Sequence, residues 1–177
     1  RPYDTYYMSM GQGYNMVTPL QLCNYVATIA NGGYNMRPYL VSKVLNPDGE
    51  TIYEKQPVVN NQVEATAEQM AQVRKAMRAV AQPGGSAYSL FRNFPIEVAA
   101  KTGTAQTGLV ADDPNKDYHG IFVAFAPYDD PEVAFAGIIE YGYHGGSSAG
   151  LVCKAVFEKY FGLNEEPIPT ELPESME

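Results

Sequence analysis

Residues 120–141 read GIFVAFAPYDDPEVAFAGIIEY and give the clearest indication of the fold. Two runs of small, branched and aromatic residues, 120–128 and 133–141, flank the sequence Asp-Asp-Pro-Glu. Such residues favour strands, and a short polar connection that contains proline favours a tight antiparallel turn. Both runs are apolar at odd and at even positions, so each strand would be buried on both of its faces. The sequence therefore predicts two adjacent antiparallel strands with helices covering each side of the sheet.

The helices that would cover this sheet are marked by their start signals. Thr18, followed by Pro-Leu-Gln, and Thr66, followed by Ala-Glu-Gln, both match a capping box, in which threonine and glutamine side chains bond the first backbone N–H groups. Apolar residues then recur at helical spacing until glycine-rich sequence ends each segment. We expect helices over about 18–30 and 66–82, and another over about 147–161.

Turn residues and composition assign three further segments. Asn-Pro-Asp-Gly at 46–49 lies between β-prone runs at 39–45 and 51–55, which is a hairpin signature. Residues 1–17 show no helical or strand period and are expected to be irregular. The acidic, proline-containing residues 164–177 are expected to form a disordered tail.

The overall composition excludes several classes of function. The chain has 177 residues, 45% of them hydrophobic, which is enough for one compact domain or a large piece of one. A net charge of −8 with only 12 Lys and Arg argues against nucleic acid as a partner. Cys23 and Cys153 fall in apolar, helix-like segments and are expected to be buried free thiols rather than a disulfide. No His or Cys spacing suits a metal, and no apolar run approaches the roughly 18 residues of a membrane span.

A third strand is expected over about 97–107, and it contains the sequence Lys-Thr-Gly-Thr at 101–104. Alternation along a strand places Thr102 and Thr104 on one face and the lysine and glycine on the other. Two hydroxyls on one face of an exposed edge can both donate to a carboxylate, and Gly103 leaves room for a close approach. An edge N–H beside them could bind an oxyanion. The alternative is that the lysine protects the sheet edge and the threonines merely favour the strand.

Three stretches in this order resemble the C-terminal half of the transpeptidase domain of class B penicillin-binding proteins, of the elongation or sporulation type. They are GQGYNMVTPLQLCNYVATIANGG at 11–33, VAAKTGTAQ at 98–106 and IFVAFAPYDDPEVAFAGIIEYG at 121–142. The resemblance covers residues 1–163 and omits only the acidic tail. It implies an α+β fold like that of penicillin-binding proteins and serine β-lactamases, an antiparallel sheet covered by helices on both faces, with only part of it in this chain.

The family carries out its chemistry with three motifs, S-x-x-K, S-x-N and K-T/S-G. No serine of this chain is followed by Lys at the third position or by Asn at the second: Ser9, Ser42, Ser86, Ser89, Ser147, Ser148 and Ser175. The resemblance therefore implies that the nucleophile lies upstream of Arg1, which would mark a cut or a boundary. We expect this chain alone to be inactive and to work with the N-terminal half of the same protein.

The resemblance also implies a role for each residue of the motif. Lys101 would contact the serine of S-x-N, and Thr102 and Thr104 would hold the carboxylate of a D-Ala-D-Ala stem peptide or of a β-lactam. The backbone N–H of Thr104 would be one of two oxyanion-hole donors, which makes Lys101 and Thr104 the predicted catalytic residues. Gly103 and Gln106 complete the predicted substrate-binding set. No cofactor and no metal is implied.

The implied partners are peptidoglycan stem peptides, β-lactam antibiotics and a glycosyltransferase of wall synthesis, on the extracytoplasmic face of a cell membrane whose anchor is not in this chain. Two alternatives stay open. One is a non-catalytic penicillin-binding sensor on the same fold. The other is a serine β-lactamase or carboxypeptidase relative, because these also carry K-T-G, although the stretch from Gly11 to Leu22 argues against it.

Some polar residues near the motif receive less weight. Gln106 and Thr107 extend the edge and are candidates for substrate contact. Five others are interpreted as solvent-facing: His119, His144, Asp112, Asp113 and Asp117. By the resemblance, the loop that holds the three aspartates borders the acceptor side of the cleft.

Overall fold

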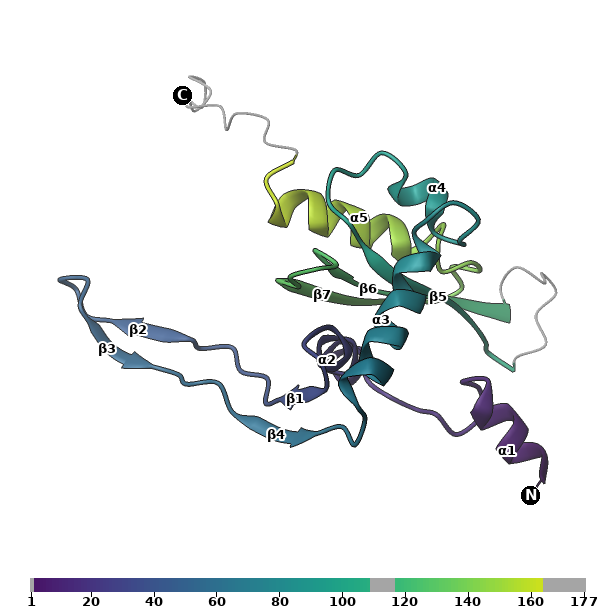
Figure 1. Ribbon diagram of the computed structural model, residues 1–177, viewed down its shortest axis with the longest axis horizontal. Coiled ribbons are helices and arrows are strands. Elements are labelled where there is room, and N and C mark those ends of the chain that lie inside the picture. The colour runs from purple at the N-terminus through teal and green to yellow at the C-terminus, as the bar shows by residue number, and fades with distance from the viewer. Residues whose placement is uncertain (1, 109–116, 164–177) are drawn as a thin grey trace, which may run out of the picture.

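The structure is a computed structural model that describes residues 2–108 and 117–163 (Figure 1). Its helices, in chain order, are α1 (Pro2–Ser9), α2 (Pro19–Ala30), α3 (Ala67–Val80), α4 (Tyr88–Phe91) and α5 (Ala149–Tyr160). Its strands are β1 (Tyr34–Met36), β2 (Lys43–Leu45), β3 (Thr51–Glu54), β4 (Val59–Gln62), β5 (Ala99–Gln106), β6 (Tyr118–Ala126) and β7 (Val133–Ile139). This is the predicted α+β class.

The central sheet has the order β5-β6-β7, and both pairs of strands are antiparallel. Opposite Thr102 on β5 lies Phe122 on β6, and opposite Phe122 on β7 lies Gly137. The three predicted strands are confirmed, together with the tight connection between the last two. Within the described residues β5 has a neighbour on one side only, so the strand with the Lys-Thr-Gly-Thr sequence forms an edge of this sheet.

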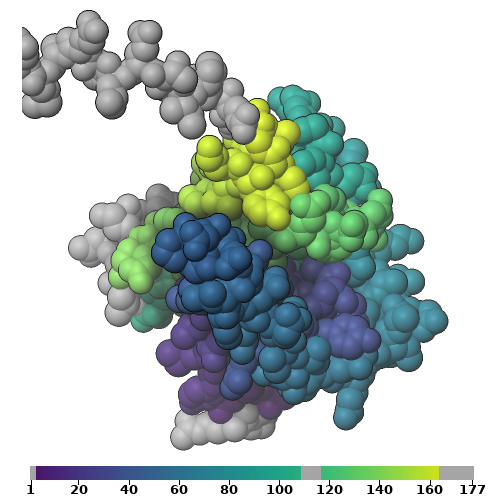
Figure 2. Space-filling model, turned by 90° about the vertical axis from the view of Figure 1, so that its left-hand side faces the viewer, coloured from purple at the N-terminus to yellow at the C-terminus, as the bar shows by residue number. Residues whose placement is uncertain are grey.

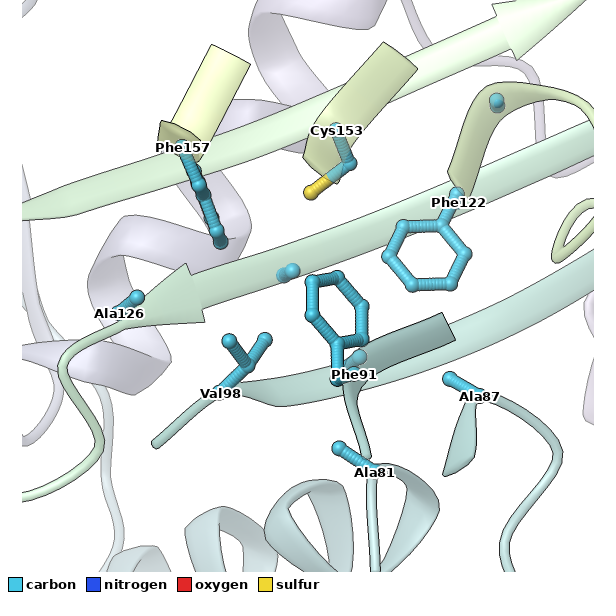
Figure 3. Close-up of a cluster of buried hydrophobic side chains, with 11 residues drawn as sticks. Ala81, Ala87, Phe91, Val98, Phe122, Ala126, Cys153 and Phe157 are labelled. Atoms are coloured by element: carbon cyan, nitrogen blue, oxygen red, sulfur yellow. The ribbon is translucent and has the colours of Figure 1, made fainter. Parts of the chain in front are cut away.

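Helices cover both faces of the sheet, as predicted, and each face has its own apolar cluster (Figure 1). On one face α4 and α5 bury Phe91, Cys153 and Phe157 against Phe122 (Figure 3). Burying a side chain of this size contributes about 1.5–3 kcal/mol. The position of β5 is therefore set by packing from two sides.

On the other face α2 and α3 bury a second set of side chains against Ala99, Val123 and Phe125: Val26, Ile29, Met70 and Met77. Both of these helices begin as the sequence predicts. Thr18 and Thr66 each form a complete capping box, in which the threonine hydroxyl accepts from a backbone N–H at 3.2 Å. The first N–H groups are thereby satisfied by local sequence.

Strands β1 to β4 form an arm that projects from the body of the molecule beside α2 and α3 (Figure 1). Figure 2 shows the molecule from the side to which this arm extends. The predicted hairpin is confirmed as β2 and β3, although both strands are shorter than the expected 39–45 and 51–55. The pairing of β1 with β4 was not predicted. All residues of β2, β3 and β4 are exposed, so this arm contributes little to the core.

The prediction that residues 1–17 are irregular is wrong for Pro2–Ser9, which form α1. The side chains of this helix are largely exposed, so it packs no apolar stripe against the core. Its sequence therefore lacks the helical spacing of apolar residues on which the prediction relies. Local polar contacts define its end instead: Ser9 Oγ donates to Tyr6 O at 2.7 Å, and Asn15 Nδ2 donates to Met8 O at 2.9 Å. The expected tail, 164–177, lies outside the described residues.

Candidate active site

The backbone of β5 exposes alternate peptide groups along the open edge of the sheet. Beyond the end of β5, Thr107 N–H donates to Asp117 O at 2.8 Å, so this N–H points toward the neighbouring strand. In an antiparallel ladder the direction alternates from one residue to the next. The N–H and C=O groups of Thr102 and Thr104 therefore point away from β6, to the edge that no described strand covers. An N–H at this edge is free to donate to a ligand.

Lys101 folds over the same edge. Its Nζ donates to the carbonyl oxygen of Thr102 at 2.6 Å, and its side chain is exposed. The stem of the lysine leaves the sheet on the face of α2, beside a cavity of about 310 Å³ whose lining is mostly apolar and includes Leu22, Tyr25 and Val73. The positive charge thus lies at the rim of the sheet, between this cavity and the open edge.

Thr102 and Thr104 face the opposite side, as alternation predicts. Both line a cavity of about 550 Å³ between the sheet edge, α4 and the loop before α5. The other lining residues are Ser86, Ser89, Leu90, His144, Gly145, Gly146, Ser147 and Leu151. Thr102 is half-buried and Thr104 is exposed, and the Oγ1 of Thr102 lies 2.9 Å from Ser86 Oγ. The cavity can therefore offer several hydroxyl groups to one polar ligand group.

The loop that follows β7 forms the far wall of this cavity and is held by its own hydrogen bonds. Ser148 Oγ donates to His144 O at 2.7 Å, and Gly150 N–H donates to Gly145 O at 2.8 Å. A Cβ on Gly145 would collide with the carbonyl oxygen of Ile121 and lie 2.6 Å from that of Gly103. Only glycine allows this loop to approach the sheet so closely.

Gly103 itself faces Ile121. A Cβ at this position would lie 3.2 Å from Ile121 Cβ, tighter than most real contacts of this kind. The close neighbour of this glycine in the structure is therefore the adjacent strand, on the lysine's face of the sheet.

The remaining predicted residues divide into two groups. Gln106 Nε2 contacts Tyr118 OH at 3.4 Å, and Thr107 Oγ1 donates to Asp117 Oδ1 at 2.7 Å, so both continue the edge beyond the motif. His119 lies on β6 and its Nδ1 accepts from Tyr141 N–H at 3.1 Å, which gives it a structural partner rather than a purely solvent-facing position. Asp112 and Asp113 lie outside the described residues.

Sequence reasoning missed Ser86, Ser147 and Gly146, and it gave His144 too little weight. All of them come from loops that are distant from the motif in sequence, and the tertiary fold alone brings them to β5. The sequence that ends in Ser86, Pro-Gly-Gly-Ser, indicates a turn, but it does not indicate which part of the fold this turn contacts.

The described groups whose pKa values are shifted do not line the cavity. Burial raises the pKa of the thiols of Cys23 and Cys153, which are both free. The hydrogen bond from Arg78 lowers the pKa of Glu97, which precedes β5. Among the described residues there is no group of three or more His, Cys, Asp or Glu that could hold a metal, and none of the described helices is long and apolar enough to cross a membrane.

Comparison with known proteins identifies relatives over nearly the same span. Penicillin-binding protein 2A of Bacillus subtilis (strain 168) is 35% identical over 171 residues, which are 89% of this chain and 24% of that protein. Peptidoglycan D,D-transpeptidase MrdA of Acinetobacter baumannii is 36% identical over 177 residues, 94% of this chain and 25% of that protein. The chain thus spans about a quarter of the length of these curated relatives.

A solved structure is similar in fold as well as in sequence. The imipenem acyl-enzyme complex of penicillin-binding protein A from M. tuberculosis has a TM-score of 0.68 and 30% sequence identity, and the match covers 88% of this chain and 33% of that one. Residues 2–159 match the family described as penicillin binding protein transpeptidase domain. The match covers most of the chain and includes the whole candidate site, and the resemblance to the transpeptidase domain of penicillin-binding proteins is confirmed. The chain belongs to the penicillin-binding protein transpeptidase family.

Proposed function

We propose that this chain is part of a peptidoglycan D,D-transpeptidase, and that residues 1–163 form the C-terminal part of its catalytic domain. In this reaction a serine attacks the D-Ala-D-Ala peptide bond of a stem peptide, D-Ala leaves, and an amine of a second stem peptide takes up the acyl group. The observation that carries the proposal is the Lys-Thr-Gly-Thr sequence on an open sheet edge, with both threonine hydroxyls turned into one cavity. The name of the A. baumannii relative supports the same activity.

The proposed roles follow from the geometry of the edge. Thr102 and Thr104 donate to the ligand's carboxylate, because their hydroxyls open into the same cavity. The N–H of Thr104 points to the open edge and stabilises the oxyanion that forms at the attacked carbonyl carbon. Removing one such donor typically costs about 10²–10³ in rate. Gln106 extends the binding edge beyond the motif.

Lys101 supplies positive charge to the site, where we propose that it contacts the serine of an S-x-N motif. Gly103 serves the site by keeping β5 and β6 close together, because a side chain there would press on Ile121. This assigns Lys101 and Thr104 to catalysis and Thr102 and Gln106 to contact with the substrate, whereas Gly103 supports binding through the spacing of the two strands.

The nucleophilic serine comes from outside this chain, since none of its serines lies in an S-x-x-K sequence. We place the rest of the transpeptidase domain against the face of α2, because Lys101 borders an apolar cavity there and Tyr25 and Val73 are exposed around it. In the intact protein the site faces the extracytoplasmic side of the cell membrane. It takes stem peptides and β-lactams there and works with a glycosyltransferase of wall synthesis.

Labelling with fluorescent penicillin tests this proposal in the full-length protein that contains this chain. The label is expected on a peptide outside residues 1–177, and the isolated chain is expected to remain unlabelled. A covalent adduct on any serine of this chain would overturn the assignment. Acylation of the full-length protein without any later transfer to an amine would indicate a penicillin-binding sensor instead of a transpeptidase.

Lys101→Ala in the full-length protein is expected to slow acylation by at least about 100-fold, the range of a lost charged or proton-transferring group. The fold is expected to persist, because the side chain is exposed and surface changes usually alter stability by less than about 0.5 kcal/mol. Lys43→Ala on β2 is the matched control and is expected to be acylated normally. Near-normal acylation of Lys101→Ala would return the lysine to a role in protecting the sheet edge.

A further inference from the structure

We propose that Ser86 is a positioning residue for Thr102, and that its hydroxyl donates to Thr102 Oγ1 when a carboxylate occupies the cavity. The two hydroxyl oxygens lie 2.9 Å apart, although Ser86 belongs to the loop between α3 and α4 and Thr102 to β5. The inference rests on the proposed function, because it concerns a hydroxyl that we assign to the ligand's carboxylate.

The direction of this hydrogen bond follows from the proton count. Each hydroxyl has one proton to donate and two lone pairs that accept, so in the empty cavity either residue can be the donor. A carboxylate only accepts. Once the Thr102 hydroxyl donates its hydrogen bond to the carboxylate, it can only accept a hydrogen bond from Ser86. Ligand binding thus aligns both protons in one direction, from Ser86 to Thr102 and from Thr102 to the carboxylate.

This arrangement strengthens the contact with the ligand in two ways. A hydroxyl that accepts one hydrogen bond becomes a better donor in the next, and each bond is strengthened by about 10–30%. The Ser86 contact also holds the Thr102 hydroxyl in one rotamer before the ligand arrives, so less freedom is lost on binding. Both effects favour ligands with a carboxylate at this position.

The loop of Ser86 is built to keep its hydroxyl in place. Gly85 N–H donates to Gln82 O at 2.8 Å, and Ala87 N–H donates to Val80 O at 2.9 Å. A Cβ on Gly85 would collide with Val80 O, and Ala87 is buried in the apolar cluster beneath α5. The backbone is therefore fixed on both sides of Ser86.

Stability alone does not account for the contact. Ser86 is exposed, so water can satisfy its hydroxyl in place of Thr102. A hydrogen bond in such a position contributes little to folding, because it replaces one with water. The contact instead lies at the mouth of the cavity that both side chains line.

The test measures acylation rates of the full-length protein with benzylpenicillin and with its methyl ester, which lacks the free carboxylate. Ser86→Ala is expected to lower the second-order acylation constant for benzylpenicillin by about three- to tenfold, the effect of losing one hydrogen bond. The loss is expected in the apparent affinity and not in the limiting rate. Ser86→Thr, which keeps a hydroxyl, is expected to restore the wild-type value. Ser42→Ala, on the arm, is the control for serine removal.

Two results would be specific to positioning. For the methyl ester, Ser86→Ala and the wild type are expected to react at the same rate, whereas a structural role would slow both ligands equally. In a Thr102→Val background, Ser86→Ala is expected to add no further loss, because the hydroxyl on which it acts is gone.

The outcomes separate this inference from the proposed function. If the wild-type protein is acylated and Ser86→Ala reacts with benzylpenicillin at the wild-type rate, the positioning role is wrong and the transpeptidase proposal stands. An equal loss for acid and ester overturns the positioning role in the same way. A wild-type protein that benzylpenicillin does not acylate overturns the proposed function, and the role of Ser86 falls with it.

Discussion

Gly145 allows the loop after β7 to lie close against the sheet, and so it helps to set the width of the cavity at Thr102. Its missing side chain leaves space that the backbone oxygens of Ile121 and Gly103 already occupy. Backbone atoms within a sheet cannot give way as a flexible side chain can. An alanine side chain at position 145 would therefore displace either the loop or the strands that it contacts.

Gly145→Ala is expected to lower the free energy of unfolding by at least about 1–3 kcal/mol, the usual cost of overpacking, and to slow penicillin acylation because the cavity wall shifts. Thermal unfolding and acylation rates of the full-length protein measure the two effects. Gly146→Ala is the matched control for stability, since its Cβ would meet Ser86 O and Thr102 Cγ2 at ordinary distances of 3.6 and 3.7 Å. Equal stability of the two variants would contradict this account.

Helix α3 begins at a capping box that the sequence predicts, and it ends at the loop that brings Ser86 to the site. Its capping box at Thr66 defines where the helix begins, Met70 and Met77 fix it against the sheet, and the loop at its other end carries Ser86. Loosening the start of the helix is therefore expected to remain local, because the buried methionines hold the rest.

Thr66→Ala is expected to destabilise the first turn of α3 by about 1 kcal/mol, the typical cost of losing a helix cap. The backbone N–H of Gln69, which donates to Thr66 Oγ1 at 3.2 Å, then loses its partner. Native-state hydrogen exchange at this amide is expected to rise about fivefold, while acylation stays normal. Thr66→Ser keeps the cap and serves as the control. Unchanged exchange in Thr66→Ala would show that the cap does not limit local opening.

The sequence predicts those elements whose cause is local. The capping boxes at Thr18 and Thr66 and the apolar runs of β6 and β7 carry their own signals, and the structure confirms them. Helix α1 has no apolar period, and β1 and β4 are separated in sequence by the β2–β3 hairpin, so their pairing, such as Tyr34 with Gln62, leaves no local signal. The same limit applies to the site. Alternation predicts that Thr102 and Thr104 share a face, but nothing near Ser86 reveals that its loop reaches them.

In the molecule as a whole, the two faces of the central sheet differ in how completely they are covered. The face under α4 and α5 is closed by aromatic packing around Phe122 and Phe157, both fully buried (Figure 3). The face under α2 keeps exposed apolar side chains such as Tyr25, which is 60% exposed. The hydroxyl side of the motif thus rests on a rigid base, whereas the lysine side borders the surface where we place the rest of the domain.

The two free thiols lie on opposite faces of the sheet, so their reactivity measures how accessible each face is. Cys153 is fully buried between α5 and the sheet, and Cys23, on α2, is half-buried. Burial raises the pKa of both thiols, so the reactive thiolate is scarce in the folded state at pH values where an exposed cysteine, with a pKa of about 8.5, already reacts. Stability that depends on a neutral buried thiol is complete below this ordinary pKa and is lost as the pH rises above it.

Alkylation with iodoacetamide at pH 8, followed by peptide mass spectrometry of the full-length protein, is expected to modify Cys23 well before Cys153. Modification of Cys153 requires α5 to leave the sheet, so its rate is expected to rise steeply with urea and to coincide with loss of penicillin acylation. That coincidence follows because Phe122, against which α5 packs, lies directly opposite Thr102 in the sheet. A Cys23→Ser variant isolates the signal of Cys153. Rapid labelling of Cys153 in the native protein would mean that α5 opens independently, and that the hydroxyl side of the motif has no rigid base.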